Sequence, residues 1–150
     1  MPLVARDTPL TEITLRRYEK PFEVSGRELY KKLCLSIGLL QPGDSRDVIV
    51  DVLQVLHHAS SKKQLLACDE VQQLVIKNRD SLGLPQLGIA PSNIRRQIRR
   101  LKDLFIVESV INKYRITEFE QLSVLYHERI EQFLIANILE RVREYFSKLN

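Results

Sequence analysis

The run SNIRRQIRRLKDL, from Ser92 to Leu104, holds four arginines and one lysine within thirteen residues. Cations on one side of a helix repel one another unless acidic side chains lie three or four residues away. Only Asp103 has such a spacing, four residues after Arg99 and three after Arg100. Phosphate groups would remove the repulsion, release counterions and add affinity. These residue types therefore indicate a nucleic acid as the partner.

The positive charge of the chain is concentrated in this region. The 150 residues have a net charge of +4. Between Pro91 and Ile116, seven basic residues stand against two acidic ones, a net +5, so the other 124 residues sum to −1. A localised field of this kind is typical of a specific anionic partner rather than of general solubility.

The composition permits a packed core. Apolar residues make up 44% of the chain and charged residues 28%. No apolar run approaches the ~18–20 residues that span a bilayer, and the first twenty residues lack the layout of a signal peptide. We expect a cytoplasmic protein without membrane association, built as one domain or one domain with a long appendage.

Apolar spacing and capping signals predict four helices up to and including the basic run. Ser25 and Glu28 have the spacing of a capping box at the start of the first. Asp44 or Ser45 would begin the second, and Pro91 the fourth, because a first helical position needs no N–H. The expected helices cover residues 25–37, 44–61, 68–82 and 91–104.

A hairpin and a long helix are expected after the basic run. β-branched and aromatic residues around a polar pair predict two short strands over 106–116. Thr117 and Glu120 form a second capping box, and neither Gly nor Pro occurs after it. A helix of about thirty residues, roughly 45 Å long, follows. It is either continuous or broken near His127.

The basic helix is expected to have one apolar side and one cationic side. Ile94, Ile98 and Leu101 would face the core. The opposite side could enter the major groove, where Arg can pair with guanine and Asn with adenine. The hairpin tip would lie along the backbone or the minor groove. The candidate DNA-binding residues are Ser92, Asn93, Arg95, Arg96, Gln97, Arg99, Arg100, Lys102, Lys113 and Arg115.

The order of helix, helix, basic helix and two strands is that of a winged helix-turn-helix. Residues 44–117 resemble the winged-helix domains of archaeal and bacterial transcriptional regulators. APSNIRRQIRRLKDLFIVESVINKYRIT is similar to their recognition helix and wing. The whole chain resembles small stand-alone archaeal regulators, although the loop from Leu82 to Ala90 is longer than the tightest turns of that class.

The fold class expected from this resemblance is mainly α with a small β-hairpin wing, a winged helix-turn-helix with a long C-terminal helix. Three regions follow. They are an N-terminal arm and helix (1–43), a DNA-binding domain (44–117) and a dimerisation helix (118–150).

The C-terminal helix has too many apolar residues, spread too widely, for one narrow stripe. Part of it could pack on the domain, whereas Phe133, Ile138, Tyr145 and Phe146 would stay exposed in a monomer. Such a helix commonly pairs with its twin. We therefore expect a homodimer through these four residues, and the alternative is a helix folded back on its own domain.

Other chemistries have weaker support. Cys34 and Cys68 lie among apolar neighbours and at no metal-ligand spacing. His57, His58 and His127 lack partners at ligand spacing. No catalytic constellation and no phosphate-binding glycine loop is visible. We therefore expect neither an enzyme nor a cofactor.

The favoured hypothesis is a sequence-specific regulator of transcription that binds double-stranded DNA as a homodimer. One alternative is a winged-helix interaction module that recruits or blocks a basal transcription or replication factor. Another is an accessory subunit in nucleic-acid processing, for example of a nuclease or of an RNA-processing assembly.

Overall fold

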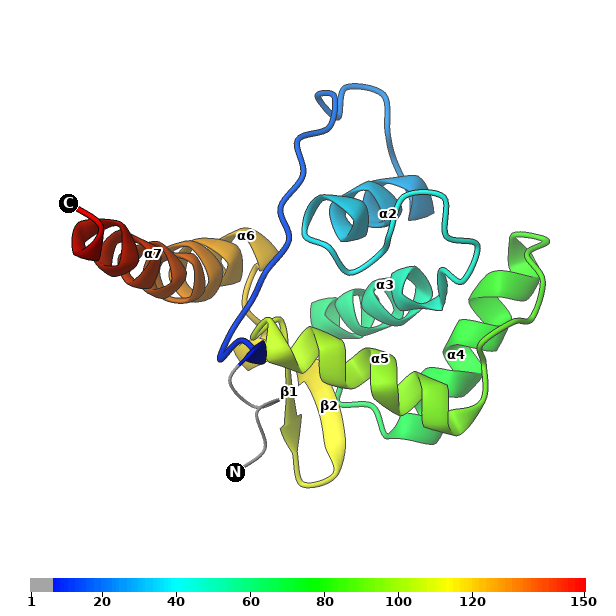
Figure 1. The fold of residues 1–150 in the computed structure, drawn as a ribbon. Coiled ribbons are helices and arrows are strands. Elements are labelled where there is room, and N and C mark those ends of the chain that lie inside the picture. Colours follow the sequence, from blue (N-terminus) through cyan, green and yellow to red (C-terminus); the bar gives the residue numbers. More distant parts are fainter. Residues whose placement is uncertain (1–6) are drawn as a thin grey trace.

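The computed structural model describes residues 7–150 and is mainly helical. Four helices come first (Figure 1), and a two-stranded hairpin and a long C-terminal helix follow. The four helices are α2 (Arg27–Ser36), α3 (Val48–Ser61), α4 (Cys68–Ser81) and α5 (Pro91–Asp103). The strands are β1 (Val107–Val110) and β2 (Lys113–Ile116), and a 3₁₀ turn, η1 (Thr117–Phe119), follows them.

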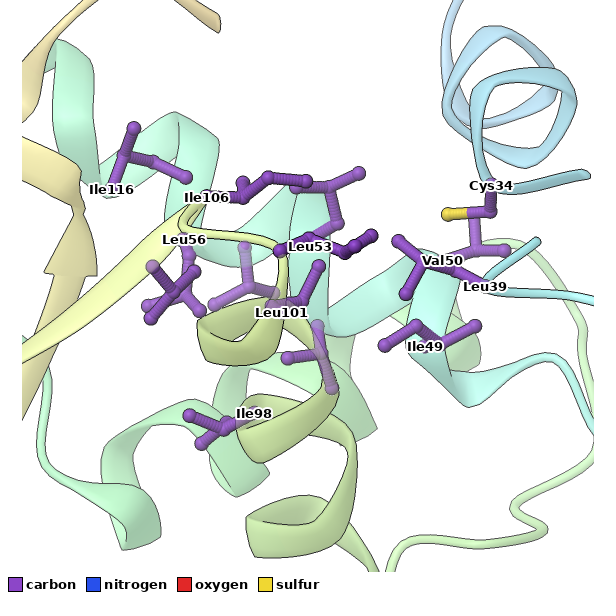
Figure 2. Packing of buried hydrophobic residues seen from close by; sticks show 14 of the residues in the cluster. Cys34, Leu39, Ile49, Val50, Leu53, Leu56, Ile98, Leu101, Ile106 and Ile116 are labelled. Atoms are coloured by element: carbon purple, nitrogen blue, oxygen red, sulfur yellow. The ribbon is translucent and has the colours of Figure 1, made fainter. Parts of the chain in front are cut away.

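Helix α3 is the centre of the core. Its residues from Val48 to Leu56 are all buried, and all of them except Asp51 and Gln54 are apolar. It packs against α2, α4, α5 and β2. Figure 2 shows side chains of α3 meeting Ile98 and Leu101 of α5 and Ile106 before the hairpin. A helix buried on all sides must be covered all round, and this requirement explains the arrangement of the other elements.

The hairpin is antiparallel and has an additional backbone partner. Val107 pairs with Ile116, and Val110 with Lys113. The backbones of Leu66 and Tyr114 exchange two hydrogen bonds of 2.9 and 2.8 Å, so the segment before α4 pairs with the free edge of β2. The hairpin is thereby fixed to the helical core.

Three predicted helix starts differ from those in the structure, and none of the three helices has a side-chain cap. The first helix begins at Arg27, with Gly26 as N-cap and no side-chain cap. The second begins at Val48, because the side chain of Asp47 bonds arginines. The third start, at Thr117, fails because Glu118 and Phe119 have positive φ and the Glu118 N–H donates to Glu108.

The C-terminal helix is continuous from Leu122 to Lys148, with no break at His127. It consists of α6 (Leu122–Leu125), the π-helical η2 (Tyr126–Ile135) and α7 (Ala136–Lys148). The wider π turn suits its packing, because the buried residues Leu125 and Ile130 are five positions apart. Within residues 7–150, no helix has the length and apolarity needed to cross a membrane.

The N-terminal segment lies across the end of α2. The Arg16 N–H donates to Ser36 O at 2.8 Å, and its guanidinium donates to Leu35 O at 2.8 Å and Leu40 O at 3.2 Å. The bonds to Ser36 O and Leu35 O satisfy carbonyls that a helix C-terminus leaves free. Gly38 permits the approach, because a Cβ there would lie 2.6 Å from the Thr14 Cβ.

Candidate nucleic-acid interface

Helix α5 has the two sides that the sequence predicts. Ile94, Ile98 and Leu101 are at most 1% exposed and fix one side to the core. The helix begins at Pro91, as expected, with its first turn after the α4–α5 loop. The outward side is therefore held in a fixed orientation by its own buried stripe.

Three arginines of α5 remain exposed and free of acidic partners. Arg95, Arg96 and Arg99 are exposed, and none of them forms an ion pair within residues 7–150. Asp103 forms no such pair with Arg99, although its spacing would allow one. Ser92 is exposed in the first turn. This group, Ser92, Arg95, Arg96 and Arg99, is called the cationic face below.

A chain of hydrogen bonds runs beside the cationic face and uses three other predicted site residues. Asn93 donates to Gly88 O at 2.7 Å and accepts from Gln97 at 3.1 Å. Arg100 donates to the Gln97 side chain at 2.9 Å and to Leu39 O at 2.6 Å. These polar groups tie α5 to the loops on either side of it, so their donors are partly occupied.

The predicted site residues at the C-terminal end of α5 and in the hairpin differ in whether their charge is already paired within the protein. Lys102 is exposed and lies 3.4 Å from the Ser109 hydroxyl of β1, so the basic surface continues onto the hairpin. Lys113 is exposed. Arg115 is paired with Glu108 at 2.7 Å and lies 4.8 Å from the centroid of the Phe119 ring. Its charge is therefore largely neutralised.

The pKa of Glu108 reflects this pairing. Burial raises it, but hydrogen bonds from the Glu118 N–H and from Arg115, with the Arg115 charge, lower it below its ordinary value overall. The carboxylate is therefore charged at neutral pH.

A buried ionic network positions the elements beneath this surface, and the sequence analysis missed it. Asp51 is 0% exposed and accepts from Arg27 at 2.9 Å and Arg79 at 2.7 Å. Asp47 accepts from the same two arginines, at 3.1 and 3.0 Å. Arg79 also donates to Pro85 O at 2.9 Å. The network thus joins α2, α3, α4 and the loop that leads into α5.

In this network the opposite charges outweigh burial in setting the pKa values of Asp47 and Arg27. Burial raises the pKa of Asp47, but the hydrogen bond from Arg79 and the charge of Arg27 lower it overall. Burial lowers the pKa of Arg27, but Asp51 and Asp47 raise it overall. The sequence feature that could have predicted this network is the single Asp within VIVDVLQVL. A charge there must be paired when it is buried.

The four predicted dimerisation residues fall into different environments. Phe133 makes an edge-to-face contact with Phe105, with ring centroids 5.7 Å apart. Ile138 and Tyr145 line a groove of about 580 Å³ between α7 and the segment from Asp7 to Thr11. Phe146 is exposed.

A second apolar set on α7 contains Phe146, which was predicted, and three residues that were not predicted to take part in dimerisation. Figure 1 shows α7 extending away from the helices that surround α3. None of its residues is buried. Leu139, Val142, Phe146 and Leu149 are all exposed, and their spacing of three, four and three residues is that of coiled-coil a and d positions. We call these four residues the α7 seam.

The environments of His57 and of the two cysteines indicate structural roles. The Tyr30 hydroxyl lies 2.6 Å from Nδ1 of His57, whose pKa is lowered by burial and by His58. Burial raises the pKa of Cys34 to about 12, and both cysteines are free thiols. Across residues 7–150, no three His, Cys, Asp or Glu side chains are grouped to hold a metal ion.

The chain was compared with protein-family models, with curated proteins and with solved structures, and it matches none of them.

Proposed function

We propose that this chain is a sequence-specific, double-stranded DNA-binding regulator of transcription that acts as a homodimer in the cytoplasm. In this proposal α4 and α5 form a helix-turn-helix, α5 is the recognition helix and the β1–β2 hairpin is the wing. The observation that carries the proposal is the cationic face, whose three arginines have no acidic partner in the described chain.

The cationic face suits the major groove in shape and charge. A helix fits this groove, and residues of its first turns reach base edges. Arg95 and Arg96 can form two bonds to guanine, and Ser92 can bond any base. Arg99 and Lys102 would bind phosphates, as would Lys113 from the wing. Asn93 and Gln97 contribute mainly by holding the helix, because their side chains already bond within the protein.

The α7 seam supports pairing with a second copy of the chain. Exposed apolar surface of this extent is uncommon on monomers. An antiparallel pair would bring the two Arg143 side chains close together, because Arg143 follows Val142 at an e position near the middle of the seam. A parallel pair avoids this repulsion. It would place both recognition helices at the same end of the dimer, where they could read two half-sites about one DNA turn apart.

The experiment that tests DNA binding is a titration of random-sequence duplex at several salt concentrations. Arg96→Ala combined with Arg99→Ala should weaken binding and reduce the magnitude of the salt slope by about two. The matched control is Lys62→Ala combined with Lys77→Ala, which removes the same charge from the hollow between α3 and α4. We expect the control to retain nearly the parental slope.

Three results would overturn the proposal. One is equal salt slopes for the two double variants, because the charge would then act without regard to position. Another is capture of a protein factor by a chain that binds no duplex. The third is metal-dependent cleavage of the nucleic acid, which would indicate a processing enzyme or its subunit.

A further inference from the structure

The tip of the hairpin holds an apolar residue in an unusual conformation. Ile111 and Asn112 form the two-residue turn between β1 and β2, and their φ angles are +48° and +63°. Turns of this kind need positive φ at both central positions, for which Asn and Gly are preferred. A β-branched residue there is strained. Asn112 suits its position, whereas Ile111 does not.

The same residue has no contact that would compensate for its strain. Ile111 is 91% exposed, the most exposed β-branched or aromatic residue of the hairpin. It does not belong to the core or to the side chains packed against the core. Its isoleucine side chain therefore contributes nothing evident to the stability of the fold.

The surroundings of Ile111 are basic and rigid. Lys113, two residues after it, is exposed, and Lys102 reaches Ser109, two residues before it. The turn projects beyond the helices in Figure 1, and the Leu66–Tyr114 bridge holds the strand behind it. The apolar tip is thus presented at one end of the basic surface formed by α5 and the hairpin.

We infer that Ile111 is an apolar wedge that enters the minor groove of DNA. This inference rests on the proposed function. When α5 lies in the major groove, a hairpin beside its C-terminal end reaches the neighbouring minor groove. That groove is about 6 Å wide and admits single side chains. Proteins that bind there insert isoleucine or similar residues against base steps, while Lys113 would bind a flanking phosphate.

The test is Ile111→Asn, which gives the turn a residue that tolerates positive φ. The melting temperature should rise by about 2–4 °C because strain is relieved. Affinity for duplex DNA should fall about tenfold because the apolar contact is lost. An apolar contact releases no counterions, so the fall should be equal at every salt concentration. The matched variant Lys113→Ala should instead reduce the salt slope by about 0.9.

A second measurement tests insertion directly. Duplexes with 2-aminopurine at successive positions should brighten at one step when the parent binds and should remain dim with Ile111→Asn. If the variant binds as tightly as the parent, the inference is wrong while the proposed function stands. A parent that binds no duplex overturns both. A lower melting temperature for Ile111→Asn would show that the isoleucine has a structural role instead.

Discussion

Helices α5 and α7 both have 13 residues, but they leave opposite chemistry uncovered. Helix α5 buries three aliphatic residues and exposes cations, whereas α7 buries none and exposes a line of apolar side chains. The arginines of the cationic face repel one another and would be stabilised by an anion. The α7 seam would be stabilised by contact with another apolar surface. The contrast shows that one small chain can expose two surfaces of opposite chemistry. Each surface favours a different partner.

The largest expected effect comes from disrupting the ionic network that joins α2, α3, α4 and the loop before α5, while leaving α7 untouched. Asp51→Ala would leave Arg27 and Arg79 buried without a full set of partners, and should cost about 3–5 kcal/mol in the free energy of unfolding. Urea denaturation measures this. The control Asp44→Ala alters an exposed side chain that accepts a hydrogen bond from the Arg46 N–H, and should cost less than about 1 kcal/mol. Similar losses for the two variants would contradict a central role for the network.

The second prediction separates the two apolar sides of α7. Leu139→Glu combined with Phe146→Glu should convert the proposed dimer into a monomer of 17.5 kDa, because charges in a coiled-coil seam oppose pairing. Light scattering at micromolar concentration measures the mass. Tyr145→Glu is the control, because Tyr145 lines the groove beside the N-terminal segment and is not a seam residue, so the proposed dimer should stay intact. A parental mass of 17.5 kDa would contradict the seam and the two-fold DNA site together.

The fold was predictable where periodicity and residue type agree. The stripe of Ile94, Ile98 and Leu101, the start of α5 at Pro91 and the hairpin all follow from local patterns, and the structure confirms them. Helix α4 also begins at Cys68, as expected, whereas the starts of α2, α3 and the C-terminal helix did not follow. At α3 the N-cap is Asp47 rather than Asp44 or Ser45, and its carboxylate bonds arginines 20 and 32 residues away instead of capping the helix. Rules based on local spacing cannot predict partners that are so far apart in the sequence.

The sequence predicted which residues are basic or polar at the candidate site. It did not predict which of their side chains are free to bind a partner. Arg99 and Arg100 are neighbours with the same charge, yet only Arg100 turns to Leu39 O. That bond depends on the packing of α2 against the core, which no local pattern gives. The α7 seam, in contrast, was visible as a repeat of three and four residues. Only Phe146 of this seam was predicted, because the size of an aromatic side chain is a stronger local signal than the heptad spacing of Leu139, Val142 and Leu149.

The smallest expected effect concerns the charge that the hairpin neutralises. Glu108→Gln would free Arg115 from its ion pair at 2.7 Å while keeping an acceptor for the Glu118 N–H. One more cation could then reach a phosphate, so the salt slope should steepen by up to about 0.9 and binding at low salt should tighten a few-fold. Stability should change by no more than about 1 kcal/mol, as for other partly exposed pairs.

The pKa of Glu108 gives this prediction a second test. Because the folded-state pKa lies below its ordinary value, the pair stays intact at neutral pH and is lost only as pH falls through that lowered value. The parental slope should therefore be constant between about pH 5.5 and 8, since an ordinary Glu titrates near 4.3. Glu12→Gln, on the N-terminal segment, changes net charge equally and is the control. If it tightened binding as much as Glu108→Gln, total charge would explain the effect and the hairpin would lose its assigned part in binding.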